Sequence, residues 1–342
     1  MNLLNRTEVR KAIRFEGPSN PPRCLSLWHN EETLEYFGGR FEKLLEEFPD
    51  DVLAAHIGIH YWHSINDDPN YRWACRGQQK PAAAIDNCPI ITDWDSQLDR
   101  FIEDMPDPNR PDAMDEIKLL RKQFPDRYIL ANWGHYFHQR IAYLRGIENL
   151  LIDMYDNVSN LTRLMEALLG FYSVWAVRSR DAGADGVWAG DDLGMQTSLF
   201  MSPDKFRQIY KPFYTELAKI LHKNSLDFWL HSCGNNYDIL SDLIEAGVDV
   251  FHPVQVGCMD ARKTLENYRG EIAFWVGMDV QNLIPFGTPE QIKAGIRERA
   301  KLFYSPRGGA IYGAGNAVMA NIPFENIQAY VETLRDFCEN PA

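Results

Sequence analysis

The sequence predicts a single α/β domain, a (β/α)8 or TIM barrel, and two observations support this prediction. From residue 180 onward, short apolar runs alternate with amphipathic segments of helical period, which is typical of βα units and a parallel sheet. Eight apolar runs of strand length occur along the 342 residues, and a barrel of this class has eight strands and a comparable length. We therefore expect one domain over residues 1–342.

Each apolar run ends in turn-forming or polar residues, as expected for a short buried strand. The three runs of the first half are less regular than the five that follow. The predicted strands are 24–28, 52–59, 128–133, 186–189, 226–230, 248–253, 272–277 and 310–313.

Three helices are predicted from residue spacing and capping signals. Leucine and aromatic residues recur at helical spacing over residues 157–181, which indicates a long amphipathic helix. Ser202 and Thr288 each stand directly before a proline, and a hydroxyl N-cap followed by proline in the first turn is typical of a helix start. These signals predict helices over 203–223 and 289–303.

The segment 60–111 is aromatic, proline-rich and acidic, and turn signals occur at Asp67-Asp68-Pro69-Asn70 and Pro106-Asp107-Pro108. We interpret it as an insertion over the barrel mouth, in the form of a small hairpin or lid. Its apolar and aromatic side chains would be exposed there, which favours a homodimer.

Composition and charge exclude several classes of protein. The chain has a formal net charge of −13 and is 45% hydrophobic, which argues for a soluble enzyme and against nucleic acid or anionic membrane as partners. No apolar run approaches the roughly 18 residues of a membrane span, and the first residues lack a secretory signal pattern, so we expect a cytoplasmic protein. Its six scattered cysteines fit reduced thiols. Neither a glycine-rich nucleotide loop nor a Gly-x-Ser-x-Gly elbow occurs.

The pair His231 and Cys233 is the strongest candidate for chemistry, because it directly follows an apolar run. Strand side chains alternate with period two, so the imidazole and the thiol emerge on the same side. Neutral imidazole and thiolate are zinc ligands, and a catalytic zinc needs about three protein ligands. Cys258 and His252 are candidates for a third ligand. The alternative is a hydrogen-bonded histidine beside a buried, apolar cysteine.

Asp191 and Asp192 follow the run at 186–189 and are the predicted catalytic residues. A carboxylate at the barrel mouth can accept hydrogen bonds from a substrate, transfer a proton or bind a cation. The alternative for Asp192 is a turn cap.

Further polar and aromatic side chains follow the strands, and the carboxyl ends of barrel strands are where substrate pockets form. The predicted substrate-binding residues are Trp133, His135, Gln196, His252, Gln255, Asp279 and Asn316.

Four motifs together resemble one family. They are Gly190-Asp191-Asp192-Leu193-Gly194, Ser202-Pro203, His231-Ser232-Cys233-Gly234-Asn235 and His252-Pro253-Val254-Gln255. With the opening segment 6–18, they resemble the uroporphyrinogen decarboxylase superfamily, and within it the branch of corrinoid-linked methyltransferases. The resemblance implies a TIM barrel, in agreement with the strand count.

The resemblance implies one of two chemistries. Decarboxylases of this family need no cofactor and act on tetrapyrroles, whose acidic arms are held by N-terminal arginines. In the methyltransferases, zinc is held by a His-x-Cys pair and a later cysteine, and it activates a thiol toward a methyl group carried on a corrinoid protein. By this resemblance His231 and Cys233 would bind zinc, and a corrinoid protein carrying methylcobalamin would be a partner.

The chain departs from both patterns. The expected arginine-rich segment supplies only Arg23, and the later zinc cysteine is expected at a position where Ala314 stands. The missing arginines favour the methyltransferase chemistry, so we expect an enzyme that moves a methyl group between a corrinoid carrier and a small acceptor or donor. Because of Ala314, two roles stay open for His231 and Cys233: they bind zinc, or they bind the substrate directly. The alternatives are a cofactor-free decarboxylase of tetrapyrrole metabolism and a non-catalytic binding barrel.

Overall fold

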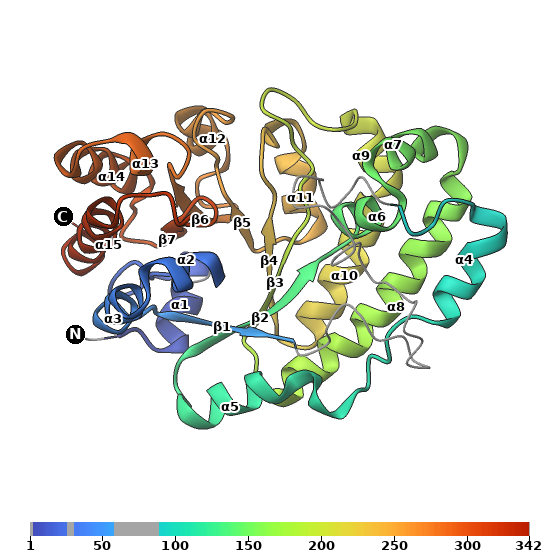
Figure 1. Cartoon of the computed structure of the whole chain (residues 1–342), viewed down its shortest axis with the longest axis horizontal. Helices are drawn as coiled ribbons and strands as arrows, with labels where there is room; N and C mark the ends of the chain where they lie inside the picture. The colour runs from blue at the N-terminus through green and yellow to red at the C-terminus, as the bar shows by residue number, and fades with distance from the viewer. Residues whose placement is uncertain (1–2, 26–30, 58–88, 342) are drawn as a thin grey trace.

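The computed structural model describes residues 3–25, 31–57 and 89–341. Seven parallel strands form one sheet in the order in which they occur along the chain (Figure 1). They are β1 (Val52–His56), β2 (Tyr128–His135), β3 (Gly186–Gly190), β4 (Asp227–His231), β5 (Val250–His252), β6 (Ala273–Met278) and β7 (Ala310–Ala314). Each matches a predicted strand, so the last seven strand predictions are confirmed within a few residues at their ends.

The first predicted strand, at 24–28, is not a strand in its described part, residues 24 and 25; residues 26–28 lie outside the described ranges. The preceding residues make a single bridge to β7, in which Cys24 N donates to Tyr312 O at 2.9 Å and Tyr312 N donates to Pro22 O at 2.9 Å. Arg23 O accepts from the first residue of β1. Pro22 has no N–H to extend a ladder. This short segment therefore connects the two edge strands of the sheet without forming a strand.

Helices lie around the outside of the sheet; in Figure 1, α8 and α10 lie to one side of the strands and α14 and α15 to the other. Of the predicted helices, α8 is confirmed, and Thr288 makes a complete capping box at the start of α14. The helices are α1 (Arg6–Ile13), α2 (Glu31–Phe37), α3 (Gly39–Glu47), α4 (Trp94–Glu103), α5 (Asp115–Gln123), α6 (His138–Arg145), α7 (Ile147–Asp156), α8 (Val158–Ala182), α9 (Pro203–Ile209), α10 (Lys211–Lys223), α11 (Leu240–Ala246), α12 (Ala261–Tyr268), α13 (Leu283–Phe286), α14 (Pro289–Phe303) and α15 (Phe324–Glu339).

The helix predicted over 203–223 is two helices, α9 and α10, which meet at Tyr210. Ser202 does cap α9, because its side chain accepts from Lys205 N. The interruption follows from Pro212, which cannot donate the next backbone hydrogen bond and whose ring crowds the preceding turn.

Residues 60–88 of the predicted insertion lie outside the described residues. The described remainder contains α4, which contacts α8 in the helical layer, so this part is neither a hairpin nor a lid. Asp93 caps α4 by accepting from Ser96 N, and the buried Trp94, Leu98 and Phe101 lie on one face. Apolar spacing of four and three residues favours a helix over a strand.

The core has two parts. An inner cluster contains one or two side chains from each of the seven strands together with residues of α1, and Trp275 contacts both Trp188 and Trp229 there. A larger cluster lies between the sheet and the helices. Trp133, predicted to line a substrate pocket, belongs to this outer cluster: it is 2% exposed and stacks on Tyr172 of α8. The prediction for Trp133 was wrong, because its side chain points from β2 toward α8.

Arginines of α1 and its C-cap form ion pairs with two buried aspartates at the amino ends of β3 and β4. Arg14 Nη2 lies 2.7 Å from Asp227 Oδ1, and Arg10 Nη2 lies 3.1 Å from Asp185 Oδ1. This end of the sheet is occupied by structural ion pairs, which leaves the carboxyl ends of the strands for chemistry. No helix among the described residues is long and apolar enough to cross a membrane.

Replacing Trp133 with alanine tests its place in the outer core. Trp133→Ala should lower the free energy of unfolding by about 3–5 kcal/mol, because it leaves a cavity between β2 and α8. Urea denaturation followed by circular dichroism measures the change. Leu119→Ala, at a side chain that is 59% exposed, should change stability by less than about 0.5 kcal/mol; a Trp133 variant as stable as this control would contradict the packing described.

Candidate functional site

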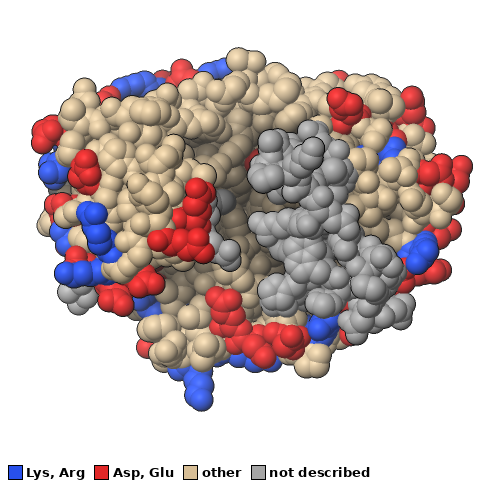
Figure 2. Space-filling view, in the orientation of Figure 1, with Lys and Arg blue, Asp and Glu red and all other residues tan. Residues whose placement is uncertain are grey.

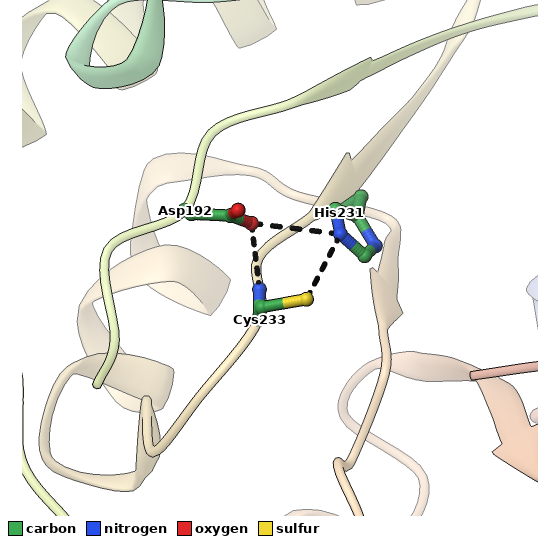
Figure 3. Close-up of side chains that lie close together, drawn as sticks. All are labelled: Asp192, His231 and Cys233. Atoms are coloured by element: carbon green, nitrogen blue, oxygen red, sulfur yellow. Dashed lines mark hydrogen bonds and ion pairs between the residues drawn. The ribbon is translucent and has the colours of Figure 1, made fainter. Parts of the chain in front are cut away.

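Three side chains from the ends of β3 and β4 lie together (Figure 3). Cys233 Sγ is 3.3 Å from His231 Nε2, and His231 Nε2 is 3.5 Å from Asp192 Oδ1. Within the described residues, these three form the group of acidic, histidine and cysteine side chains that could share a metal ion, with ligand atoms within 4.8 Å of one another. The predicted pair is therefore joined by a carboxylate that was predicted for another role.

The two loops that carry these side chains are in close backbone contact. Gly234 has φ +85°, and a Cβ there would lie 2.3 Å from the carbonyl carbon of Gly194. Leu193 N donates to Ser232 Oγ at 2.9 Å. Only glycine permits this conformation and this approach. The contact brings Asp192 Oδ1 to 2.9 Å from Cys233 N, which donates to it.

His252 lies behind His231 and does not line the cavity wall as predicted. It is 1% exposed, its ring centroid is 4.1 Å from that of Trp275, and its Nδ1 is 2.7 Å from His231 Nδ1. Its Nε2 is 2.9 Å from Ala314 O. Burial lowers the pKa of both imidazoles, opposed at His231 by the nearby charge of Asp192. Both rings are therefore neutral at pH 7.

The thiol of Cys233 is protonated at neutral pH in the metal-free protein. Burial and the neighbouring Asp192 charge raise its pKa to about 12, while a hydrogen bond from Asn316 acts in the opposite direction. Asn316 Nδ2 lies 3.3 Å from Sγ. Cys258, the other predicted third ligand, instead donates its thiol to Gln196 Oε1 at 2.8 Å.

Asp191 points away from this group. Its carboxylate accepts from Phe137 N at 2.9 Å and from Gln139 N at 2.5 Å, at the start of α6, and from the hydroxyl of Tyr214. Burial nevertheless raises its pKa to about 6. These contacts give Asp191 the role of anchoring α6 to the end of β3, whereas Asp192 faces Cys233.

A cavity of about 160 Å³ opens beside Cys233. Three predicted substrate-binding residues, Gln255, Asp279 and Asn316, line it. Gln255 Oε1 accepts from Gly234 N at 2.6 Å, so its side chain also holds the Cys233 loop. The face of the molecule in Figure 2 is hollowed near its centre, with acidic side chains along one side of the hollow.

Gln139, on the first turn of α6, was missed by sequence reasoning. Its Nε2 is 3.5 Å from Asp192 Oδ2, and its Oε1 is 3.1 Å from Nδ1 of His135. It thus connects His135, a predicted pocket residue, to the site carboxylate. The predicted strand ended at residue 133, whereas β2 continues to His135. With the strand end at residue 135, the start of α6 and therefore Gln139 would have been expected at the carboxyl ends of the strands.

Two methyltransferases from Methanosarcina mazei are similar to this chain. The methylated-thiol–coenzyme M methyltransferase is 24% identical over 195 residues, which is 57% of this chain and 50% of that protein. The chain thus matches half the length of this relative. A solved structure described as a methyltransferase is 18% identical, with a TM-score of 0.68 over 97% of this chain and 98% of the other. The second likeness shows a shared TIM-barrel-like fold.

The family model for uroporphyrinogen decarboxylase (URO-D) matches residues 86–337. The match contains β2 to β7 and the loops that carry Asp192, His231 and Cys233. It confirms the resemblance that the four sequence motifs indicated. This chain belongs to the uroporphyrinogen decarboxylase (URO-D) family.

Proposed function

We propose that this protein is a methyltransferase that moves a methyl group between a corrinoid carrier protein and a small acceptor or donor, with zinc held at the strand ends. The proposal rests on the group formed by Asp192, His231 and Cys233, whose ligand atoms lie within 4.8 Å of one another. The methyltransferase similar to the chain is named for a methylated thiol, so a small thiol is the acceptor that we propose.

The donor set fits zinc. One imidazole nitrogen, one sulfur and one carboxylate oxygen are ligands that zinc accepts, and three protein ligands leave a position open for a substrate atom. Asp192 would supply the third ligand, because the alanine at position 314 has no side-chain atom that can bind a metal. The charge of the site also suits a cation. The negative charge of Asp192 contributes to the raised pKa of Cys233, and the same charge favours a positive ion between the two groups.

A zinc ion at this position would lower the pKa of a bound thiol, so that its thiolate is present at neutral pH. The residues of the chain hold and orient the reactants. The 160 Å³ cavity beside Cys233 admits a small molecule. Asn316 presents its amide to Cys233, and Gln139 holds Asp192 from the opposite side.

Zinc content distinguishes the two aspartates and two of the cysteines. The wild-type protein should bind about one equivalent of zinc. Losing a residue that only supports a ligand weakens metal binding by roughly 10–100-fold. Cys233→Ser and Asp192→Asn remove a ligand itself, so each should lower the zinc affinity by more than that. The matched controls Cys258→Ser and Asp191→Asn should retain zinc, because neither side chain faces the group. Plasma emission spectrometry and chelator competition measure content and affinity. Zinc retained by Cys233→Ser would rule out the site.

The pH dependence of zinc affinity follows from the raised pKa of Cys233. The thiol is protonated below about pH 12 without metal, and a ligand thiol must lose its proton, so binding should release about one proton. The apparent affinity should rise about tenfold per pH unit between about pH 6.5 and 8.5. Chelator competition across this range measures the slope, which should flatten in Cys233→Ser. An equally flat slope in the wild type would contradict a thiolate ligand.

The activity itself can be tested with free methylcobalamin and a small thiol under anoxic conditions. The carbon–cobalt bond breaks, its electron pair stays on cobalt, and the thiol sulfur gains the methyl group and loses its proton. The zinc-loaded protein should accelerate formation of cob(I)alamin and the thioether, measured by absorbance and mass spectrometry. Asp191→Asn should stay active if it folds, and Cys233→Ser should not. Decarboxylation of a porphyrinogen without methyl transfer would support the alternative.

A further inference from the structure

Two buried histidines and one carbonyl form a chain of hydrogen bonds behind the site. His231 Nδ1 is 2.7 Å from His252 Nδ1, and His252 Nε2 is 2.9 Å from Ala314 O. The rings belong to neighbouring strands, where His231 and His252 are register partners of β4 and β5. Ala314 is the last residue of β7.

The direction of these hydrogen bonds is determined by the carbonyl. A carbonyl oxygen can only accept, so His252 Nε2 must carry the proton. His252 is 1% exposed, and a charged imidazolium at such a place is costly, so its Nδ1 has no proton and acts as the acceptor. The donor in the contact between the two Nδ1 atoms is then His231. A neutral His231 with its proton on Nδ1 presents an unprotonated Nε2 toward Cys233 Sγ.

We infer that His252 is a positioning residue, which through its hydrogen bonds to His231 and Ala314 O holds His231 in the tautomer whose Nε2 can bind a metal ion. The inference rests on the proposed function only for the identity of the bound ion. The tautomer itself is a property of the metal-free protein.

The competing tautomer would have a different set of contacts. With its proton on Nε2, His231 would direct an N–H toward Asp192 Oδ1, 3.5 Å away, and could not bind a cation there. The electrostatic attraction of Asp192 for that proton therefore works against metal binding. The acceptor at His252 opposes it, because a hydrogen bond at 2.7 Å is closer than the contact at 3.5 Å. Outer partners of metal-binding histidines commonly act in this way.

Nitrogen-15 NMR of the metal-free protein with labelled histidine tests the tautomers directly. The chain has nine histidines, so His231 and His252 are assigned from single substitutions. We expect the proton of His231 on Nδ1 and that of His252 on Nε2. A metal-free His231 with its proton mainly on Nε2 would overturn the inference, whatever the metal content of the protein.

Two variants separate the hydrogen bond from simple packing. His252→Asn places an amide oxygen close to the position of Nδ1 and retains an acceptor for His231, whereas His252→Phe retains the ring against Trp275 and removes the acceptor. His252→Phe should move the proton of His231 toward Nε2 and weaken zinc binding by roughly 10–100-fold. His252→Asn should keep the Nδ1 proton and most of the affinity. Circular dichroism verifies folding of both.

The outcomes separate this inference from the proposed function. The positioning role is supported if the wild type has the expected tautomers, His252→Asn keeps them and His252→Phe loses them. This holds even if no zinc binds. The absence of zinc would then contradict only the proposed function. Zinc bound with unchanged affinity in a folded His252→Phe, together with an unchanged His231 tautomer, overturns the positioning role and leaves the proposed function standing.

Discussion

The backbone contact between Gly194 and Gly234 is the constraint on which the rest of the site depends. It joins the loops after β3 and β4 at a distance that no side chain could tolerate. Because the loops are locked together, the carboxylate of Asp192 accepts from Cys233 N, and the thiol lies beside His231. Contacts within the polypeptide therefore set the positions of these three side chains, and groups with fixed positions need less ordering when a ligand binds.

The charged groups at the two ends of the sheet differ. At the amino ends of the strands, the buried Asp185 and Asp227 are paired with Arg10 of α1 and with Arg14, which directly follows α1. At the carboxyl ends, Asp192 lies beside two neutral groups, a thiol and an imidazole. A carboxylate beside neutral ligand atoms at a partly open position favours a bound cation, and this one lies at the end of the sheet where barrel enzymes bind their substrates.

Much of the fold could be predicted from the sequence, because strand runs and helix caps are local signals. The break at Tyr210 and the single bridge at Arg23 reflect the effects of Pro212 and Pro22 on the backbone, which a hydrophobic pattern does not show. The strand ends also predicted where Asp192, His231 and Cys233 lie. The separate roles of Asp191 and Asp192 were not predicted, since period-two alternation puts them on opposite sides without telling which side faces the mouth. The pairing of His231 with His252 depends on strand register, which a single sequence does not reveal.

The acceptor at the end of β7 is a main-chain carbonyl, that of Ala314. Every amino acid carries the same carbonyl group, so this hydrogen bond does not depend on which side chain occupies the position. What it does depend on is the path of the backbone as β7 ends. A change of side chain at position 314 would therefore leave the hydrogen bond to His252 intact, so that the ligand atoms of the proposed metal site can change while the backbone that supports the histidine stays the same.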